Sequence, residues 1–339
     1  MLWKRNRRRS VLAYKPVHFL KLYAYSKLSP PPYAAQYLTL GTQGTSKEWN
    51  NTYGEMNLKD SSFIWKASAV AVIFVSFMSA SFAAESDESD KENSNWTGYI
   101  ATTYQNNWAD DYRNEPHVDI DLKVGYEFTD DFSAGVITGA YYLDTRYCST
   151  HTKDYWCASP TYLYSKFSDI YKLGDFASID LKGNILLPTT QYAQDTHLYL
   201  GLVLATPLDI EVDRYIDSLD LVFTPSITKY FNKYKTAGNT NLTEYTFSLG
   251  LSSSYQITDK LTFTFSALNS HYVTYKGDTL YPSISHSEEL GYDINDDLYV
   301  GIGYSNNAQF YNPDRGPNPI SGLFDDKDPH YYLTFSYSF

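Results

Sequence analysis

The sequence predicts an all-β fold, an antiparallel transmembrane β-barrel of about 12 strands. The last ten residues alternate without a break between two faces and end on an aromatic side chain. The composition includes 34 Tyr and 18 Phe, residue types that favour strands and membrane interfaces. No apolar run reaches the roughly 18 residues that a membrane-spanning helix needs, whereas alternating strands need no such run.

The final segment, residues 330–339, reads HYYLTFSYSF. Its larger apolar face consists of Tyr331, Leu333, Phe335, Tyr337 and Phe339. This ending resembles the C-terminal strand of Gram-negative outer-membrane β-barrels, which typically closes on Phe with aromatic residues at alternate positions. The resemblance implies an integral protein of the cell outer membrane, in contact with lipid and lipopolysaccharide. It also implies that this strand is the insertion signal for the barrel-assembly machinery.

The first 83 residues differ from the rest of the chain. Residues 1–55 carry nine Lys or Arg against two acids and show no sustained periodicity. Met56 then opens a second beginning, in which Lys59 and Lys66 precede an apolar stretch at 67–80 and a small-x-small sequence at 81–83. Residues 56–83 are therefore predicted to be a secretory signal peptide. Because such a signal works at an N-terminus, residues 1–55 are expected to be a non-native upstream extension, with a disordered basic extension as the alternative.

The remaining chain is strongly acidic. Residues 1–83 contain 11 basic and 3 acidic residues, so the part after them holds 16 basic against 36 acidic residues, a net charge of −20. Such a balance excludes nucleic acid as a partner. Residues 84–94 are Ser-, Asp-, Glu- and Asn-rich and are predicted to be a disordered periplasmic leader. Residues 95–339 are predicted to form the barrel.

Twelve segments of this region have strand-like alternation. In chain order they are residues 96–104, 118–128, 132–142, 160–167, 177–187, 198–204, 218–223, 244–257, 260–268, 283–294, 298–304 and 330–339.

The links between these segments alternate in length. Residues 126–132, 255–261 and 292–298 are near copies in which Thr or Asn and Asp separate two alternating runs, and residues 171–176 make a looser fourth turn. Longer polar links are predicted at 106–117, 144–159, 188–196, 232–243, 276–282 and 306–329. Short periplasmic turns and long extracellular loops are typical of outer-membrane barrels.

Charged side chains alternate with apolar ones in the predicted strands. Facing lipid at mid-depth, ionised groups would cost several kcal/mol, so they are expected in the lumen. The predicted lumen-lining residues are Asp119, Asp121, Lys123, Glu127, Asp180, Lys182 and Asp220. A soluble β-sandwich or jelly roll would also alternate, but it would need neither a terminal aromatic residue nor strands of this length.

The only two cysteines, Cys148 and Cys157, both fall in the second long link. In an exported protein this pair is expected to form one disulfide. His151 and Asp154 nearby do not supply enough ligands for a metal site, so no metal and no cofactor are predicted.

The chain offers little for catalysis. His286, Ser287 and Glu288 are adjacent, but on one strand His286 and Ser287 point to opposite faces and cannot pair as base and nucleophile. No enzyme activity is predicted. The acidic excess among the lumen residues favours a passive channel for small solutes with a cation or neutral preference. The alternative is a closed barrel whose surface loops serve adhesion, recognition or envelope structure.

Overall fold

The computed structural model describes residues 95–106, 116–143, 155–174, 176–212, 215–238, 240–309, 311–312, 316–317 and 330–339. The predicted upstream extension (1–55), signal peptide (56–83) and periplasmic leader (84–94) lie outside the described residues. Within these ranges, no helix is both long and apolar enough to cross a membrane.

Long strands make up almost all of the described chain. They are β1 (Trp96–Asn106), β2 (His117–Thr129), β3 (Phe132–Leu143), β5 (Thr161–Leu173), β6 (Ala177–Leu187), β7 (Leu198–Ala205) with its continuation β8 (Leu208–Ile210), β9 (Leu219–Asn232), β12 (Thr243–Gln256), β13 (Leu261–Thr274), β14 (Thr279–Asp293), β15 (Leu298–Gln309) and β18 (His330–Ser338). Short elements lie in the links between them: β4 (Trp156–Ala158), α3 (Gln191–Asp195), β10 (Thr236–Ala237), β11 (Thr240–Asn241), β16 (Tyr311–Asn312) and β17 (Gly316–Pro317).

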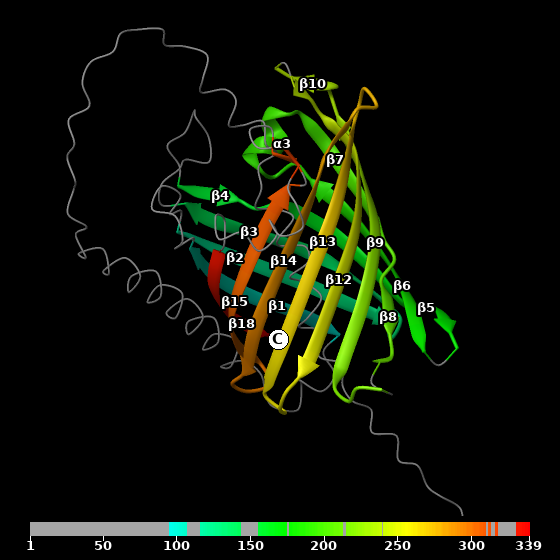
Figure 1. The fold of residues 1–339 in the computed structure, drawn as a ribbon, viewed down its shortest axis with the longest axis vertical. Coiled ribbons are helices and arrows are strands. Elements are labelled where there is room, and N and C mark those ends of the chain that lie inside the picture. The colour runs from blue at the N-terminus through cyan, green and yellow to red at the C-terminus, as the bar shows by residue number, and fades with distance from the viewer. Residues whose placement is uncertain are drawn as a thin grey trace, which may run out of the picture.

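These strands close into a twelve-stranded antiparallel barrel (Figure 1). Strands that are neighbours in the sequence are neighbours in the sheet. The last strand, β18, closes the ring because it pairs with β15 on one side and with the first strand, β1, on the other. In that seam Tyr337 lies opposite Ile100 on one side and Leu298 on the other. The predicted all-β barrel is therefore confirmed, because an open sandwich or jelly roll has no such continuous ring.

The predicted tight turns lie at one end of the barrel, opposite α3 and β10 (Figure 1). In the β2–β3 turn Thr129 Oγ1 accepts the backbone N–H of Phe132 at 3.1 Å. In the β12–β13 turn Thr258 Oγ1 accepts that of Leu261 at 3.0 Å. In the β14–β15 turn Asn295 Oδ1 accepts that of Leu298 at 2.7 Å. The repeated Thr or Asn thus performs the same capping role in each turn.

One predicted long link is wrong. Residues 276–282 were expected to form a loop, but β14 already begins at Thr279, and β13 and β14 are joined by a tight turn with Gly277 at φ +86°. Pro282, a residue type that sheets usually confine to edges and bulges, lies inside β14. The pairing skips from Ser270 to Tyr272 on β13, and Pro282 lies at this bulge, where a ladder hydrogen bond is not required.

The strand predicted at 218–223 is also too short. β9 runs from Leu219 to Asn232 and contains Pro225. On its neighbour the strand is broken between β7 and β8 at Thr206 and Pro207, and the backbone N–H of Thr206 reaches the carbonyl of Pro225 at 3.1 Å. Pro225 therefore lies beside an existing break in the ladder, which makes a residue without an N–H tolerable.

The exterior of the barrel is apolar. Side chains on the outward rows include many of the most exposed large hydrophobic residues, such as Leu163, Ile185, Leu202, Phe223, Leu249, Leu251, Phe263, Leu290 and Ile302. Leu249 is 49% exposed and Ile302 is 63% exposed. Such a surface requires lipid around it. The face directed inward is consequently the polar one.

Candidate functional site

The interior of the barrel is the candidate site. Its candidate residues, Asp119, Asp121, Lys123, Glu127, Asp180, Lys182 and Asp220, lie on the rows opposite to the outward apolar side chains. A role in lining a conducting path stays a prediction for each of them. The register decides which of these groups meet.

Asp119 belongs to a polar group near the end of the barrel that carries the long links. Its Oδ2 accepts a hydrogen bond from Gln105 Nε2 at 2.7 Å and lies 3.6 Å from His117 Nε2. These residues come from β1 and β2, which pair directly, with Gln105 opposite His117. The carboxylate is thus held in place by its neighbours, and its side chain keeps 17% of its surface exposed.

Asp121 and Glu127 continue the inward row of β2 beyond Asp119. Asp121 faces Gly139 on β3, and a methyl group added at Gly139 would approach its carboxylate oxygen to 3.0 Å. The missing side chain therefore leaves room for this carboxylate. Glu127 is exposed near the β2–β3 turn, at the end with the tight turns.

Lys166 was not among the predicted lumen residues, but it lies with Lys182 and Asp180 on the inward face of β5 and β6. Lys166 on β5 lies directly opposite Lys182 on β6, and its Nζ forms an ion pair with Asp180 Oδ2 at 3.0 Å. Asp180 also accepts the backbone N–H of Asp169 at 3.0 Å. The inward row of β5 begins with Tyr162 and Tyr164. The alternation of charged and apolar residues is therefore weaker around Lys166 than around Lys123 or Lys182. Asp209 on β8, opposite Ser178, is a further inward acid that was missed.

Aromatic rings pack over glycines on the same wall. Tyr164 lies in a niche formed by Gly125 and Gly135, where an added methyl group would come within 2.0 Å and 2.8 Å of its side-chain atoms. Lys123 Nζ lies 5.0 Å from the centre of the Tyr164 ring. This contact is a cation–π interaction and gives Lys123 a neighbour other than a carboxylate.

A second glycine niche holds a buried acid on the other side of the seam. Tyr299 donates a hydrogen bond to Glu289, and both side chains are buried. The carboxylate of Glu289 packs over Gly301, while Tyr332 packs over Gly303. The sequence signal for this arrangement is the glycine pair Gly301 and Gly303 at alternate inward positions of β15.

The opposite wall is lined by small hydroxyl groups. Ser248 and Ser270 are hydrogen-bonded at 2.8 Å across β12 and β13, and Asp220 accepts from Ser254 at 3.2 Å. The inward rows of β9, β12, β13 and β14 include Thr224, Ser226, Thr228, Thr246, Ser248, Ser252, Ser254, Thr264, Ser266, Ser270, Ser285 and Ser287. The interior therefore has a charged, aromatic part and a part rich in hydroxyl groups, in which Asp220 is an acid.

The cysteines can be placed only in part. Cys157 lies on β4 opposite Tyr141, is 5% exposed, and is not free. Cys148 lies outside the described residues. The disulfide between the two stays a prediction.

The row His286, Ser287 and Glu288 is divided between two faces, as expected for a strand. Ser287 lies opposite Ser266 on the inward row, while His286 and Glu288 lie on the outward row with Leu290. His286 and Glu288 contact each other, with Nδ1 3.0 Å from Oε1. The tyrosine ring of Tyr304 lies 5.9 Å from the imidazole.

Comparison with known proteins supports the fold. No family model and no curated protein matches the chain. An outer membrane channel from Pseudomonas putida F1 matches with a TM-score of 0.50 and 10% identity, over 75% of this chain and 100% of the channel. The NanC porin (TM-score 0.46, 10% identity, 71% of this chain and 98% of the porin) and the KdgM porin (0.41, 11%, 71% and 99%) are also similar. The chain has the porin-like fold of outer-membrane β-barrels. This fold is consistent with an integral protein of the cell outer membrane.

Proposed function

We propose that this chain is a passive channel of the outer membrane for small polar solutes, with a preference for cations or neutral molecules. The observation that carries the proposal is the polarity of the interior. Charged and hydroxyl side chains occupy most of the inward rows, with the Gly201, Val203 and Ala205 row of β7 as an exception, while the outward rows are mainly apolar. A barrel of this size is intermediate between small barrels filled by side chains and large water-filled porins.

Carboxylates outnumber ammonium groups on the inward rows of the described strands. The acids are Asp119, Asp121, Glu127, Asp180, Asp209, Asp220, Glu289 and Asp293, and the bases are Lys123, Lys166, Lys172 and Lys182. In a narrow space with walls of low dielectric constant, such an excess raises the local concentration of cations. This balance supports the cation preference.

The hydroxyl wall supports passage of neutral solutes. Serine and threonine side chains both donate and accept hydrogen bonds, so they can replace the water around an uncharged polar molecule. Ser248 and Ser270 are examples, and their hydroxyl groups lie 2.8 Å apart. A neutral solute would contact this wall without displacing an ion pair.

A closed barrel is the second candidate. The observation in its favour is the ion pair of Lys166 with Asp180, together with the Tyr164 ring, on one side of the interior. Internal ion pairs and rings of this kind can fill a lumen as well as line one. Under this alternative the surface loops would be the working part, in adhesion, recognition or envelope structure.

Single-channel recording of the purified barrel in a planar bilayer separates the two candidates. A channel should give discrete openings, and a salt gradient should give a reversal potential displaced toward the cation equilibrium value. A barrel that migrates as folded on an unheated gel but gives no openings would contradict the channel proposal and support the closed barrel.

A further inference from the structure

The outward row of β9 changes character at its upper end. It presents Leu219, Leu221, Phe223, Pro225 and Ile227, and then Lys229 and Phe231. Ten residues of a strand tilted by about 40° rise roughly 25 Å, which is the height of the apolar band of a membrane barrel. Lys229 therefore lies at the outer edge of the band when Leu219 lies at the periplasmic edge. Lys233 continues the same parity just beyond the strand.

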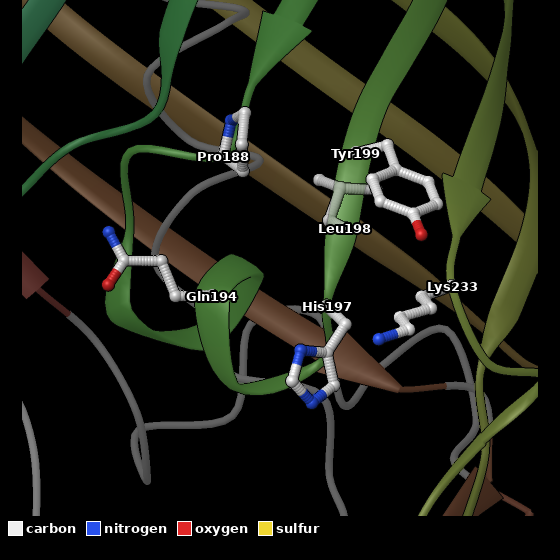
Figure 2. Close-up of a pocket in the computed structure, with 6 residues that line it drawn as sticks. All are labelled: Pro188, Gln194, His197, Leu198, Tyr199 and Lys233. Carbon is white, nitrogen blue, oxygen red and sulfur yellow. The ribbon is translucent and has the colours of Figure 1, made fainter.

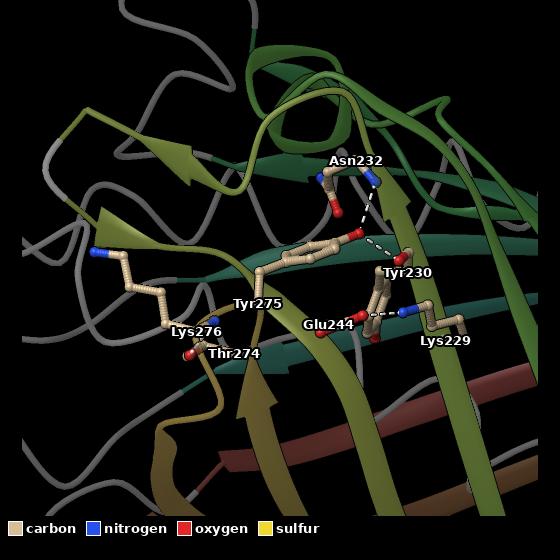
Figure 3. A network of polar contacts seen from close by, with 7 residues as sticks. All are labelled: Lys229, Tyr230, Asn232, Glu244, Thr274, Tyr275 and Lys276. Carbon is tan, nitrogen blue, oxygen red and sulfur yellow. Dashed lines mark hydrogen bonds and ion pairs between the residues drawn. The ribbon is translucent and has the colours of Figure 1, made fainter.

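Aromatic rings surround the ammonium group of Lys229. Its Nζ lies 4.1 Å from the centre of the Tyr245 ring, 5.5 Å from that of Tyr275 and 5.6 Å from that of Phe231. It forms an ion pair with Glu244, as Figure 3 shows, yet the lysine side chain keeps 24% of its surface exposed. A cation held among aromatic rings at the outer edge of the apolar band can thus reach the lipid headgroups.

Tyr275 fixes this region by crossing to β9. Its hydroxyl donates to the carbonyl of Tyr230 at 2.5 Å and accepts the backbone N–H of Asn232 at 2.9 Å (Figure 3). Both of its polar contacts are to backbone atoms, so they hold the ring whatever side chain occupies the neighbouring positions. The backbone of β9 therefore fixes the position of the Tyr275 ring, which is one of the rings around Lys229.

A pocket lies beside this cluster. It has a volume of about 390 Å³ and is lined by Pro188, Gln194, His197, Leu198, Tyr199 and Lys233 (Figure 2). The backbone joins the two nitrogen-bearing residues, because the N–H of Lys233 donates to the carbonyl of His197 at 2.9 Å. A bulge at the start of β7 leaves Tyr199 62% exposed. The pocket combines basic side chains with an apolar floor.

Two further exposed lysines lie on the links next to these residues. The carbonyl of Lys235 accepts the N–H of Leu242, whose carbonyl in turn accepts the N–H of Tyr275, the residue before Lys276. None of Lys233, Lys235 and Lys276 has an ion pair with another residue in the part of the chain that the structure describes. Lys229, Lys233, Lys235 and Lys276 thus lie in one sector of the rim, which also holds the acids Glu244 and Asp278.

We propose that this sector, Lys229, Lys233 and His197 with the rings of Tyr199, Phe231 and Tyr245, binds the phosphorylated headgroup of a lipid in the outer leaflet. Lysine suits phosphate as a point charge, and aromatic rings at this level pack against the sugar and acyl parts of such a lipid. The inference depends on insertion of the barrel in the outer membrane and not on conduction through it.

Retention of lipid A by the purified barrel tests the proposal. The barrel is reconstituted in phosphatidylcholine vesicles containing bis-phosphorylated lipid A, extracted in mild detergent, and analysed by native mass spectrometry. Lys229→Gln and Lys233→Gln should each reduce retention roughly fivefold, which corresponds to about 1 kcal/mol per basic residue near an anionic surface. Glu244→Gln should increase retention because it releases Lys229. Lys172→Gln and Lys260→Gln, both near tight turns at the other end, serve as the matched control.

Each outcome has a defined meaning. Unchanged retention in the folded Lys229→Gln/Lys233→Gln variant would overturn the site, and folding of that variant is checked by its migration on an unheated gel. Equal loss in the control pair would also overturn it. If 10 mM inorganic phosphate removes lipid A completely from the wild-type barrel, the site recognises free phosphate and the lipid assignment is wrong. Lower retention of monophosphorylated lipid A would support phosphate as the recognised group.

Discussion

His286 and Glu288 form a contact on the outward face of β14, with 3.0 Å between Nδ1 and Oε1. They lie six and four residues from Tyr292, an exposed ring beside the β14–β15 turn, which places them roughly 10–15 Å along the barrel from that turn. That level is inside the apolar band, where an ionisable group is costly unless it is paired. Each side chain thus provides the other with a hydrogen-bond partner at a level where the lipid tails offer none.

The first prediction concerns this pair. Glu288→Leu should destabilise the barrel by about 1–3 kcal/mol, because His286 loses a hydrogen-bond partner in an apolar setting. The double variant His286→Leu/Glu288→Leu should recover most of that loss, since apolar side chains suit the outward row. Urea unfolding in lipid vesicles, followed by tryptophan fluorescence, measures both. A double variant that is less stable than the single one would contradict the pairing.

The second prediction concerns selectivity. Asp119→Asn and Asp121→Asn together remove two negative charges at nearly constant volume, so the reversal potential in a salt gradient should move toward anions. The Gln105 contact can persist because Asn retains a carbonyl oxygen. Asp259→Asn, in an exposed tight turn, is the control and should change nothing. A stable, conducting double variant with unaltered selectivity would exclude these residues from the conducting path.

The third prediction concerns the glycine niche of Tyr164. A methyl group at Gly135 would come within 2.1 Å of the Val124 carbonyl oxygen and 2.8 Å of the Tyr164 ring. Gly135→Ala should therefore cost about 1–3 kcal/mol, as overpacking does elsewhere. Gly183→Ala is the matched control, because its nearest neighbour is the Ser165 hydroxyl at 3.3 Å. Equal unfolding midpoints for the two variants would show that the niche is not tight.

The fourth prediction concerns Cys148 and Cys157. We expect the two to be joined, with a stabilisation of order 2–3 kcal/mol for the short loop that the bond closes. The bond should be dispensable for insertion because it lies outside the main ladder. Mass spectrometry of unreduced peptides checks the pairing, and insertion of Cys148→Ser checks the second part. Two free thiols in protein taken from the cell envelope would refute the bond.

The fifth prediction concerns processing. The exported chain should begin at Ala84 or within a residue or two, following the predicted signal peptide at 56–83. N-terminal sequencing of the membrane-extracted protein tests this. Peptides from residues 1–55 on that mature chain would refute it.

The sequence by itself determined the fold class and the division between the two faces. Both follow from period 2, which is a local property of a strand: the side chains at 118, 120 and 122 must face away from those at 119, 121 and 123. The repeated Thr–Asp and Asn–Asp turns were equally local, because a side chain three residues from the N–H that it caps is recognisable in the sequence. Prediction failed at Pro225 and Pro282, where the outcome depended on breaks and bulges in neighbouring strands.

Only the tertiary structure decided which side chains meet. Asp180 was predicted to face the lumen, but its pairing with Lys166 depends on the register between β5 and β6. Lys229 and Tyr275 come together across β12 in the same way. Register is fixed by closing the whole ring, with β18 held between β15 and β1, and a shift of one residue would reverse every face. Alternation along a strand carries no information about that shift, so partners had to come from the closed barrel.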